Sequence, residues 1–234
     1  MSDIDVLYED NHLLALNKPA GLATMGTPGD TASLLDLARE YIKRRYQKPG
    51  NVYLGVVSRL DAPVTGVVVI ARTSKAAARL TEQFRSGTVE KLYWAVVEGS
   101  VPAGPVACEG WIVEDERHRR MHLVPADTPD AKLCRLTYRR LEALGDNTLV
   151  EVAPATGRKH QIRVQLAARG NAIVGDRKYG SRRAFSPGIA LHARRLVIDH
   201  PVLHQPVELT APVPGSWKPL GGLNQRDWGL GIRD

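Results

Sequence analysis

The chain has 234 residues, of which 43% are hydrophobic and 24% are charged, so it can bury a substantial core and its composition excludes a disordered chain. This length predicts a single domain over residues 1–234, with the Gly- and Pro-rich residues 212–234 loosely packed. The longest apolar run, Val67 to Ala71, is far shorter than a membrane helix, and the acidic N-terminus does not resemble a signal peptide. Cys108 and Cys134 are too few for a disulfide framework or a four-thiolate site, which favours a reducing, cytoplasmic location.

The net charge of +7 is unevenly distributed along the chain. Residues 158–195 contain ten Lys and Arg and one acid, giving a local charge of +9, and the rest of the chain sums to −2. Such a cluster is typical of a surface that binds a polyanion, because each neutralised phosphate releases counterions. The charge therefore favours nucleic acid as the partner, and a solubilising basic surface is the alternative.

Apolar and alternating runs indicate a protein rich in short strands. The predicted strands cover residues 6–8, 12–16, 52–57, 67–71, 92–97, 110–113, 121–124, 133–138, 149–152, 196–198 and 207–209. Helical periodicity predicts helices over 32–45, 75–85 and 159–169, the second capped by Thr73 or Ser74 and stopping near Gly87, and the third stopping at Gly170. This order predicts an α+β fold with a large, mainly antiparallel (mixed) sheet flanked by helices.

The loop from Ser58 to Gly66 lies between two apolar predicted strands, so both of its ends are expected to be fixed. Loops held in this way often carry function. Arg59 and Asp61 place opposite charges two positions apart at the start of a buried strand. Taken alone, this pair also fits a structural Arg and Asp in a turn.

Several motifs of the chain resemble those of the RluA-type RNA pseudouridine synthases, in the same order. The matching segments are Val6 to Asp10, Leu16 to Gly21, Arg59-Leu60-Asp61 with Thr65 to Ile70, Lys91 to Gly99, Thr156 to Arg163, Ile173 to Asp176 with Tyr179-Gly180, Leu191 to Ala193, and His200-Pro201. The resemblance implies a pseudouridine synthase catalytic domain. No S4-like RNA-binding domain is expected before the opening hairpin. The chain departs from the family where Ser58 replaces the usual His or Gly, and where Val64-Thr65 replaces Thr-Ser.

The implied reaction detaches uracil from its ribose, rotates the base and rejoins it through C5, so it needs no redox cofactor. Asp61 is the implied catalytic carboxylate. A carboxylate can attack ribose C1′ or uracil C6, or assist departure of the base, and the sequence does not choose among these routes.

The resemblance assigns two further residues to the pocket of Asp61. Burial raises the pKa of a carboxylate and a nearby cation lowers it, so Arg163 is expected to pair with Asp61 and keep it ionised. A phosphate contact or a solvated helix residue is the alternative for Arg163. Tyr93 is expected to stack on the uracil with its hydroxyl near C5, and a core aromatic is the alternative.

A uridine inside folded RNA must leave its stack before it can react, and Arg59 is expected to insert into the gap unless it forms a structural salt bridge. The remaining predicted substrate or RNA contacts are Lys18, Arg158, Lys159, His160, Arg177, Lys178, Arg182, Arg183, Leu191 and His192. The sequence contains no metal-binding spacing around His160 and His192, which are interpreted as positioning residues, and no phosphate-loop motif, so neither a metal nor a nucleotide cofactor is expected.

The sequence thus predicts a metal-free pseudouridine synthase that acts on structured tRNA or rRNA, with a monomer expected. Two alternatives belong to other classes. A catalytically inactive RNA-binding or ribosome-associated protein would keep the scaffold, although it would not need Asp61, Tyr93 and Arg163 together. A nucleobase glycosylase would use the carboxylate for hydrolysis and release free uracil.

Overall fold

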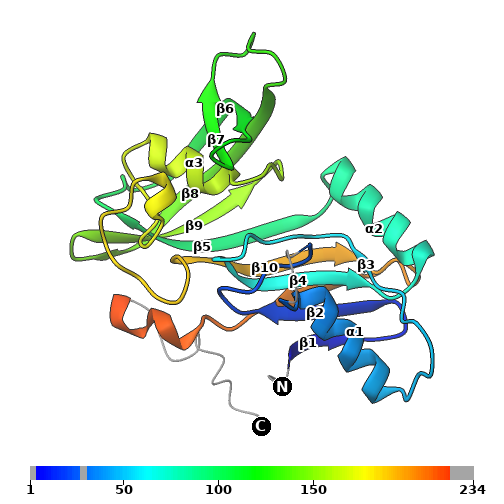
Figure 1. Cartoon of the computed structure of the whole chain (residues 1–234). Helices are drawn as coiled ribbons and strands as arrows, with labels where there is room; N and C mark the ends of the chain where they lie inside the picture. Colours follow the sequence, from blue (N-terminus) through cyan, green and yellow to red (C-terminus); the bar gives the residue numbers. More distant parts are fainter. Residues whose placement is uncertain (1–3, 27–30, 222–234) are drawn as a thin grey trace. The chain divides into compact units, whose positions relative to one another are not determined.

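The computed structural model describes residues 4–26 and 31–221, which form two compact units. Among these residues, unit 1 comprises 4–26, 31–90 and 193–212, and unit 2 comprises 91–192 and 213–221 (Figure 1). The chain therefore leaves unit 1, builds most of unit 2 and returns to complete unit 1. The single-domain organisation of residues 1–234 stays a prediction.

Unit 1 contains a sheet in the order β1 (Asp5–Glu9), β2 (Leu13–Lys18), β4 (Thr65–Ala71) and β10 (Leu191–Asp199), with most of β10 in this unit. The short β3 (Gly55–Val56) pairs with β4, and β11 (Pro206–Thr210) pairs with β10. The β1–β2, β2–β4, β3–β4 and β10–β11 pairs are antiparallel.

Both faces of this sheet are covered, which explains why β2 and β4 are continuous apolar runs instead of alternating ones. Leu14, Leu16, Val68 and Ile70 pack on the face that contacts α1 (Leu34–Arg45). The alternate residues of the same strands pack on the face that contacts α2 (Ser74–Ser86); they are Leu13, Ala15, Val67, Val69 and Ala71. The two helices therefore lie on opposite faces of the sheet.

The ends of α1 and α2 follow from capping residues. Ser33 and Asp36 form a capping box at the start of α1. The Thr73 hydroxyl accepts a hydrogen bond from the amide of Ala76 at the start of α2, and Gly87, with φ 77°, ends that helix in the left-handed conformation that glycine adopts without strain. The structure thus chooses Thr73 as the cap.

Unit 2 contains a sheet in the order β5 (Glu90–Glu98), β9 (Asn147–Pro154), β8 (Lys132–Leu144), β6 (Pro105–Asp115) and β7 (Arg120–Val124). Each of the four neighbouring strand pairs in this order is antiparallel. The unit also contains α3 (Gln161–Ala168) and two 3₁₀ helices, η1 (Arg177–Tyr179) and η2 (Gly215–Leu220). Val164 of α3 and Tyr179 of η1 form a core cluster with Ile112, Met121 and Cys134 of the sheet.

The prediction of an α+β fold with a mainly antiparallel sheet is confirmed. The predicted strand over residues 52–57 shortens to Gly55–Val56. The third helix begins at Gln161 instead of residue 159, because His160 has φ 52° and closes a turn ahead of the helix. Cys108 and Cys134 are buried free thiols.

The predicted loose packing of residues 212–234 is wrong for the part that the structure describes. Val213 is 3% exposed and Trp217 is fully buried. Removal of such apolar side chains from water lowers the free energy of the folded state, which favours packing over a loose arrangement. Residues 222–234 lie outside the described residues. Across residues 4–26 and 31–221, no helix is long and apolar enough to cross a membrane.

Candidate active site

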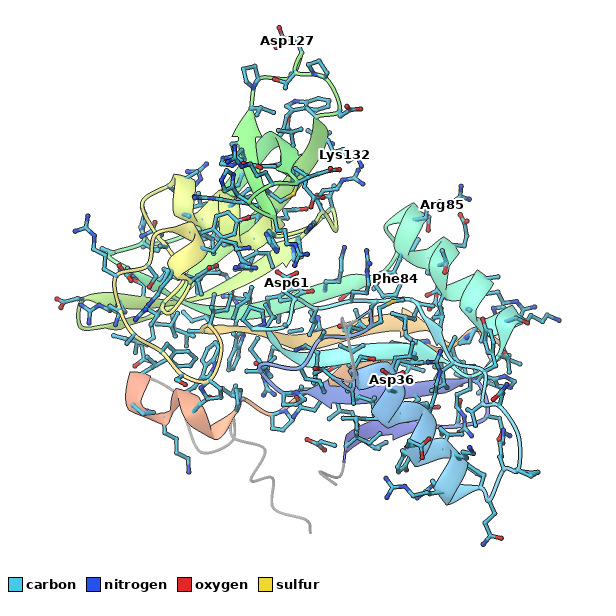
Figure 2. The ribbon with its side chains drawn as sticks, in the orientation of Figure 1. Asp36, Asp61, Phe84, Arg85, Asp127 and Lys132 are labelled. Carbon is cyan, nitrogen blue, oxygen red and sulfur yellow. The ribbon has the colours of Figure 1, made fainter. Side chains whose placement is uncertain are left out.

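Asp61 lies in unit 1 on the loop that leads into β4, where Figure 2 labels it. The residue before it, Leu60, is held through both of its backbone polar groups. The Thr24 hydroxyl donates a hydrogen bond to the carbonyl of Leu60 at 2.9 Å and accepts one from its amide at 3.1 Å. The buried Thr24 hydroxyl therefore satisfies the backbone amide and carbonyl of Leu60, as a neighbouring strand would in a sheet.

The residue after Asp61, Ala62, is held through its carbonyl by the end of β2 and the segment that follows it. The carbonyl of Ala62 accepts hydrogen bonds from the amide of Gly21 at 2.8 Å and from Lys18 Nζ at 3.0 Å. A further bond from the amide of Val64 to the carbonyl of Asp61, at 3.0 Å, closes the turn. The backbone is thus fixed on both sides of the predicted catalytic carboxylate.

Lys18 is fully buried, and its ammonium donates to three carbonyls, those of Pro19 (2.8 Å), Leu22 (2.7 Å) and Ala62. Burial lowers the pKa of Lys18 to about 8, and the nearby charge of Asp61 opposes that shift. Because an ammonium has three N–H donors, Lys18 has none left for a phosphate. The predicted RNA contact is corrected to a structural role beneath the Asp61 loop.

Two small residues fit this loop to β4. The Ser58 hydroxyl accepts a hydrogen bond from the amide of Val69 at 2.9 Å, so the departure at Ser58 supplies a tie between the loop and the strand. Gly66 has φ 111°, and a Cβ at this position would lie 2.3 Å from the carbonyl oxygen of Ala193. Any side chain at Gly66 would therefore push β4 away from β10.

Arg163 lies on α3 of unit 2 and is 5% exposed. Its Nε and Nη2 donate to the two carboxylate oxygens of Asp176 at 2.7 and 2.9 Å. This bidentate pair fixes the plane of the guanidinium. Asp176 was noted as the single acid of the basic region and as the end of the motif that begins at Ile173. Its role as the partner of Arg163 was missed. The predicted pairing of Arg163 with Asp61 stays a prediction.

Tyr179 supports the same guanidinium from its ring face. The guanidinium carbons of Arg163 and Arg120 both lie 5.0 Å from its ring centroid. Its hydroxyl accepts a hydrogen bond from the amide of Met121 at 2.9 Å and lies 2.8 Å from His160 Nδ1. Burial raises the pKa of Tyr179, so the phenol keeps the proton that it can donate to His160. The Tyr179 hydroxyl therefore orients the His160 ring, and the predicted RNA contact of His160 stays a prediction.

The loop from Thr156 to Arg158 is fixed by the buried Gln161, a role that the sequence analysis missed. Gln161 Oε1 accepts hydrogen bonds from the Thr156 hydroxyl at 2.7 Å and the amide of Arg158 at 3.1 Å. Its Nε2 donates to the carbonyl of Arg135 at 2.9 Å. Tyr93 lies on the neighbouring β5, opposite Val152 of β9, and is partly buried.

The basic region of residues 158–195 is divided by the fold. Arg194 and Arg195 belong to unit 1, whereas the other eight basic residues belong to unit 2. Several of the cations also have carboxylate partners: Lys159 with Glu114, Arg163 with Asp176, Arg183 with Asp146, and Arg195 with Glu90 and Glu208. Four of these carboxylates, Glu114, Asp146, Glu90 and Glu208, lie outside residues 158–195, so they offset part of the charge of +9 counted along the sequence.

The remaining predicted RNA contacts fall into two groups. Exposed side chains that fit this role are Arg59, Arg158, Lys159, Arg177, Lys178, Arg182 and Arg183. Leu191 and His192 are instead buried, at 3% and 0% exposure, and the ring of His192 packs edge-on against Trp217. A direct contact with RNA is therefore wrong for these two residues, which pack inside unit 2.

The described part of the chain comprises residues 4–26 and 31–221. It contains no group of three or more His, Cys, Asp or Glu side chains arranged to hold a metal ion. Asp61 on its fixed loop in unit 1, and Arg163 and Tyr93 in unit 2, stay the predicted catalytic residues.

Comparison with known proteins agrees with this set of motifs. Residues 12–168 match the model of the RNA pseudouridylate synthase family. The chain is 32% identical to the ribosomal large subunit pseudouridine synthase C of Vibrio vulnificus over 89% of its own length and 65% of that protein, so it spans about two thirds of the longer relative. It is 36% identical to the dual-specificity RNA pseudouridine synthase RluA of Escherichia coli O6:H1, over 88% of this chain and 92% of that one.

The solved structure of human RNA pseudouridylate synthase domain containing 4 aligns with a TM-score of 0.77 and 26% identity, covering 92% of each chain. Fold, sequence model and relatives agree. The chain therefore belongs to the RNA pseudouridylate synthase family, is of the RluA type within it, and is a pseudouridine synthase.

Proposed function

We propose that the chain isomerises a uridine of structured tRNA or rRNA to pseudouridine, with Asp61 as the catalytic carboxylate. In this reaction the C1′–N1 bond breaks and a C1′–C5 bond forms, while C5 loses a proton and N1 gains one. The observation that carries the assignment is the fixation of both neighbours of Asp61, by Thr24 on Leu60 and by Lys18 and Gly21 on Ala62. A carboxylate that must meet one atom of a flipped base benefits from a backbone that is positioned in advance.

Arg163 and Tyr93 complete the proposed chemistry. Arg163 would balance the charge of Asp61 in a pocket closed by substrate, and the bond to Asp176 keeps its guanidinium in one orientation. Tyr93 would stack on the extruded uracil and face C5, from which the proton leaves. Arg59, which is exposed two positions before Asp61, would fill the space that the flipped base vacates.

The names of the relatives suggest which RNA to test. One acts on the ribosomal large subunit and another is described as a dual-specificity enzyme. Ribosomal and transfer RNA are therefore the two substrates of the proposal, and exposed cations of unit 2 such as Arg177, Lys178 and Arg182 would contact their phosphates. A cytoplasmic location and a monomeric state belong to the same proposal.

The test is the release of tritium from RNA labelled at uracil C5, with transfer RNA and ribosomal RNA as separate substrates and a chelator present. We expect release by the wild type from at least one RNA, and a loss of at least about 1,000-fold in Asp61→Asn, because the amide cannot act as a nucleophile. Binding of the same RNA by Asp61→Asn, together with an unchanged thermal unfolding curve, would show that the variant is folded.

Three results would overturn the proposal. Turnover reduced only a few-fold in Asp61→Asn would place the catalytic group elsewhere. Free uracil and a lowered RNA mass would identify a glycosylase, since isomerisation leaves the RNA mass unchanged. If neither RNA releases tritium although both bind, the chain is an RNA-binding protein on this scaffold and the proposed activity is wrong for these substrates.

A further inference from the structure

Lys91 is a partly buried cation of unit 2 that the proposed mechanism does not use. It lies on β5 two residues before Tyr93, so both side chains point to the same side of that strand. Burial lowers the pKa of Lys91, and no other cause contributes to the shift. In the part of the chain that the structure describes, no carboxylate forms an ion pair with this ammonium. A cation that has lost water without gaining an acid is stabilised by an anion from outside.

Gly157 lies beside this ammonium. Because β5 and β9 are antiparallel with Tyr93 opposite Val152, the start of β5 is next to the end of β9, from which the chain continues to Gly157. A Cβ built on Gly157 would lie 3.9 Å from Lys91 Nζ. The amide nitrogen of Gly157 is about 2.5 Å from that Cβ position, so one group can contact both nitrogens.

The amide of Gly157 also has an unused N–H. Among the described residues it donates no hydrogen bond, and Gly157 is exposed. The loop around it is nevertheless rigid, because Gln161 binds both of its neighbours, the Thr156 hydroxyl and the amide of Arg158. Among the described residues neither Lys91 Nζ nor the amide of Gly157 donates a hydrogen bond, and two such donors can bind an oxyanion.

We infer that Lys91 Nζ and the amide of Gly157 bind one phosphate of the RNA substrate next to Tyr93. The inference rests on the proposed function, since it takes RNA as the source of the oxyanion. It also explains the glycine, whose φ is not in the left-handed region and whose backbone therefore does not require it. A side chain at Gly157 would cover the ammonium on the side from which a phosphate approaches.

The test compares Lys91→Gln with Lys75→Gln, which removes the same charge from an exposed position on α2. RNA affinity is measured over a range of salt concentrations, and KM and kcat are measured by tritium release. We expect Lys91→Gln to raise KM about tenfold and to reduce the slope of log affinity against log salt by about 0.7 to 0.9, the value of one phosphate contact. Lys75→Gln should leave the slope and KM unchanged, and Lys91→Arg should restore most of the affinity.

Gly157→Ala is the second variant, and it keeps every charge. Its methyl group would meet Lys91 Nζ at an ordinary contact distance, so we expect the wild-type unfolding temperature and a several-fold higher KM. The inference is overturned if Lys91→Gln keeps the wild-type salt slope and KM, or if Lys75→Gln changes them equally. Because affinity is measured without turnover, an inactive wild type that loses one phosphate contact in Lys91→Gln would contradict only the proposed function.

Discussion

The two units hold their proposed catalytic residues by different means. In unit 1 the backbone on both sides of Asp61 is fixed by hydrogen bonds to the carbonyl and amide of Leu60 and to the carbonyl of Ala62. In unit 2 the side chain of Arg163 is fixed directly, by the carboxylate of Asp176 and the ring of Tyr179.

Because of this difference, the two units should tolerate different amino-acid substitutions. A backbone clamp does not depend on the identity of the clamped side chains, which here are those of Leu60 and Ala62. A side-chain clamp with charges depends on both partners, because removal of one leaves the other buried and uncompensated. Substitutions can therefore separate positioning from stability in the two units.

The largest effect is expected for Asp176→Asn. The variant removes the charge of the carboxylate that the buried Arg163 binds through two hydrogen bonds, which costs about 3 to 5 kcal/mol in the free energy of unfolding. Urea unfolding monitored by circular dichroism measures this loss. In the double variant Asp176→Leu with Arg163→Met, stability should recover in part, and a double variant less stable than Asp176→Asn would contradict the assignment of a buried ion pair.

Lys18→Met should follow in size. It keeps the length of the side chain but leaves the carbonyls of Pro19, Leu22 and Ala62 without their donor, at a cost of about 1 to 3 kcal/mol for a buried group left unsatisfied. We also expect a lower kcat, since Ala62 adjoins Asp61. Lys43→Met, at an exposed position on α1, is the matched control. A lost unfolding stability with unchanged kcat would limit Lys18 to a purely structural role.

The pH dependence of stability gives a second test of Lys18. Its pKa is about 8 in the folded protein and lies near its ordinary value of 10.5 in the unfolded chain. Between these values the unfolded state binds more protons, so Lys18 makes the free energy of unfolding rise with pH over this window. The wild type minus Lys18→Met difference should therefore increase from pH 8 to pH 10.5. A difference that is constant or falls over the window would show that the ammonium is not penalised by burial.

Thr24→Val tests the backbone clamp without a charge. The valine keeps the shape of the side chain and loses both hydrogen bonds to Leu60, which we expect to cost about 1 to 2 kcal/mol in stability. If positioning of Asp61 matters, kcat should fall while RNA affinity stays the same. A change in affinity alone, measured by filter binding, would argue that Thr24 serves the RNA surface instead.

The smallest effect is expected for Ser58→Ala. This change removes the short bond that the Ser58 hydroxyl accepts from the amide of Val69 (2.9 Å) and the long bond that it donates to the carbonyl of Val69 (3.4 Å). It should cost about 1 kcal/mol, with kcat reduced less than in Thr24→Val. The residues on either side of Asp61 keep their own bonds. A kcat loss larger than that of Thr24→Val would mean that the loop is positioned mainly from β4.

The sequence predicted the fold class and most of the strands and helices, because the apolar periodicity of segments such as residues 67–71 and 75–85 reflects which side chains are buried. It also located the Asp61 loop and the segment that contains Arg163, because these motifs are contiguous in the chain.

The residues that hold the Asp61 loop and the Arg163 side chain could be identified only from the folded chain. Lys18 and Thr24 reach Ala62 and Leu60 across more than thirty positions, and Asp176 meets Arg163 through the turn that follows α3, so no local pattern records these contacts. The same reason explains the errors for Lys18 and His192. A charged or polar residue in a motif predicts an exposed contact, whereas burial depends on neighbours that only the folded chain brings together.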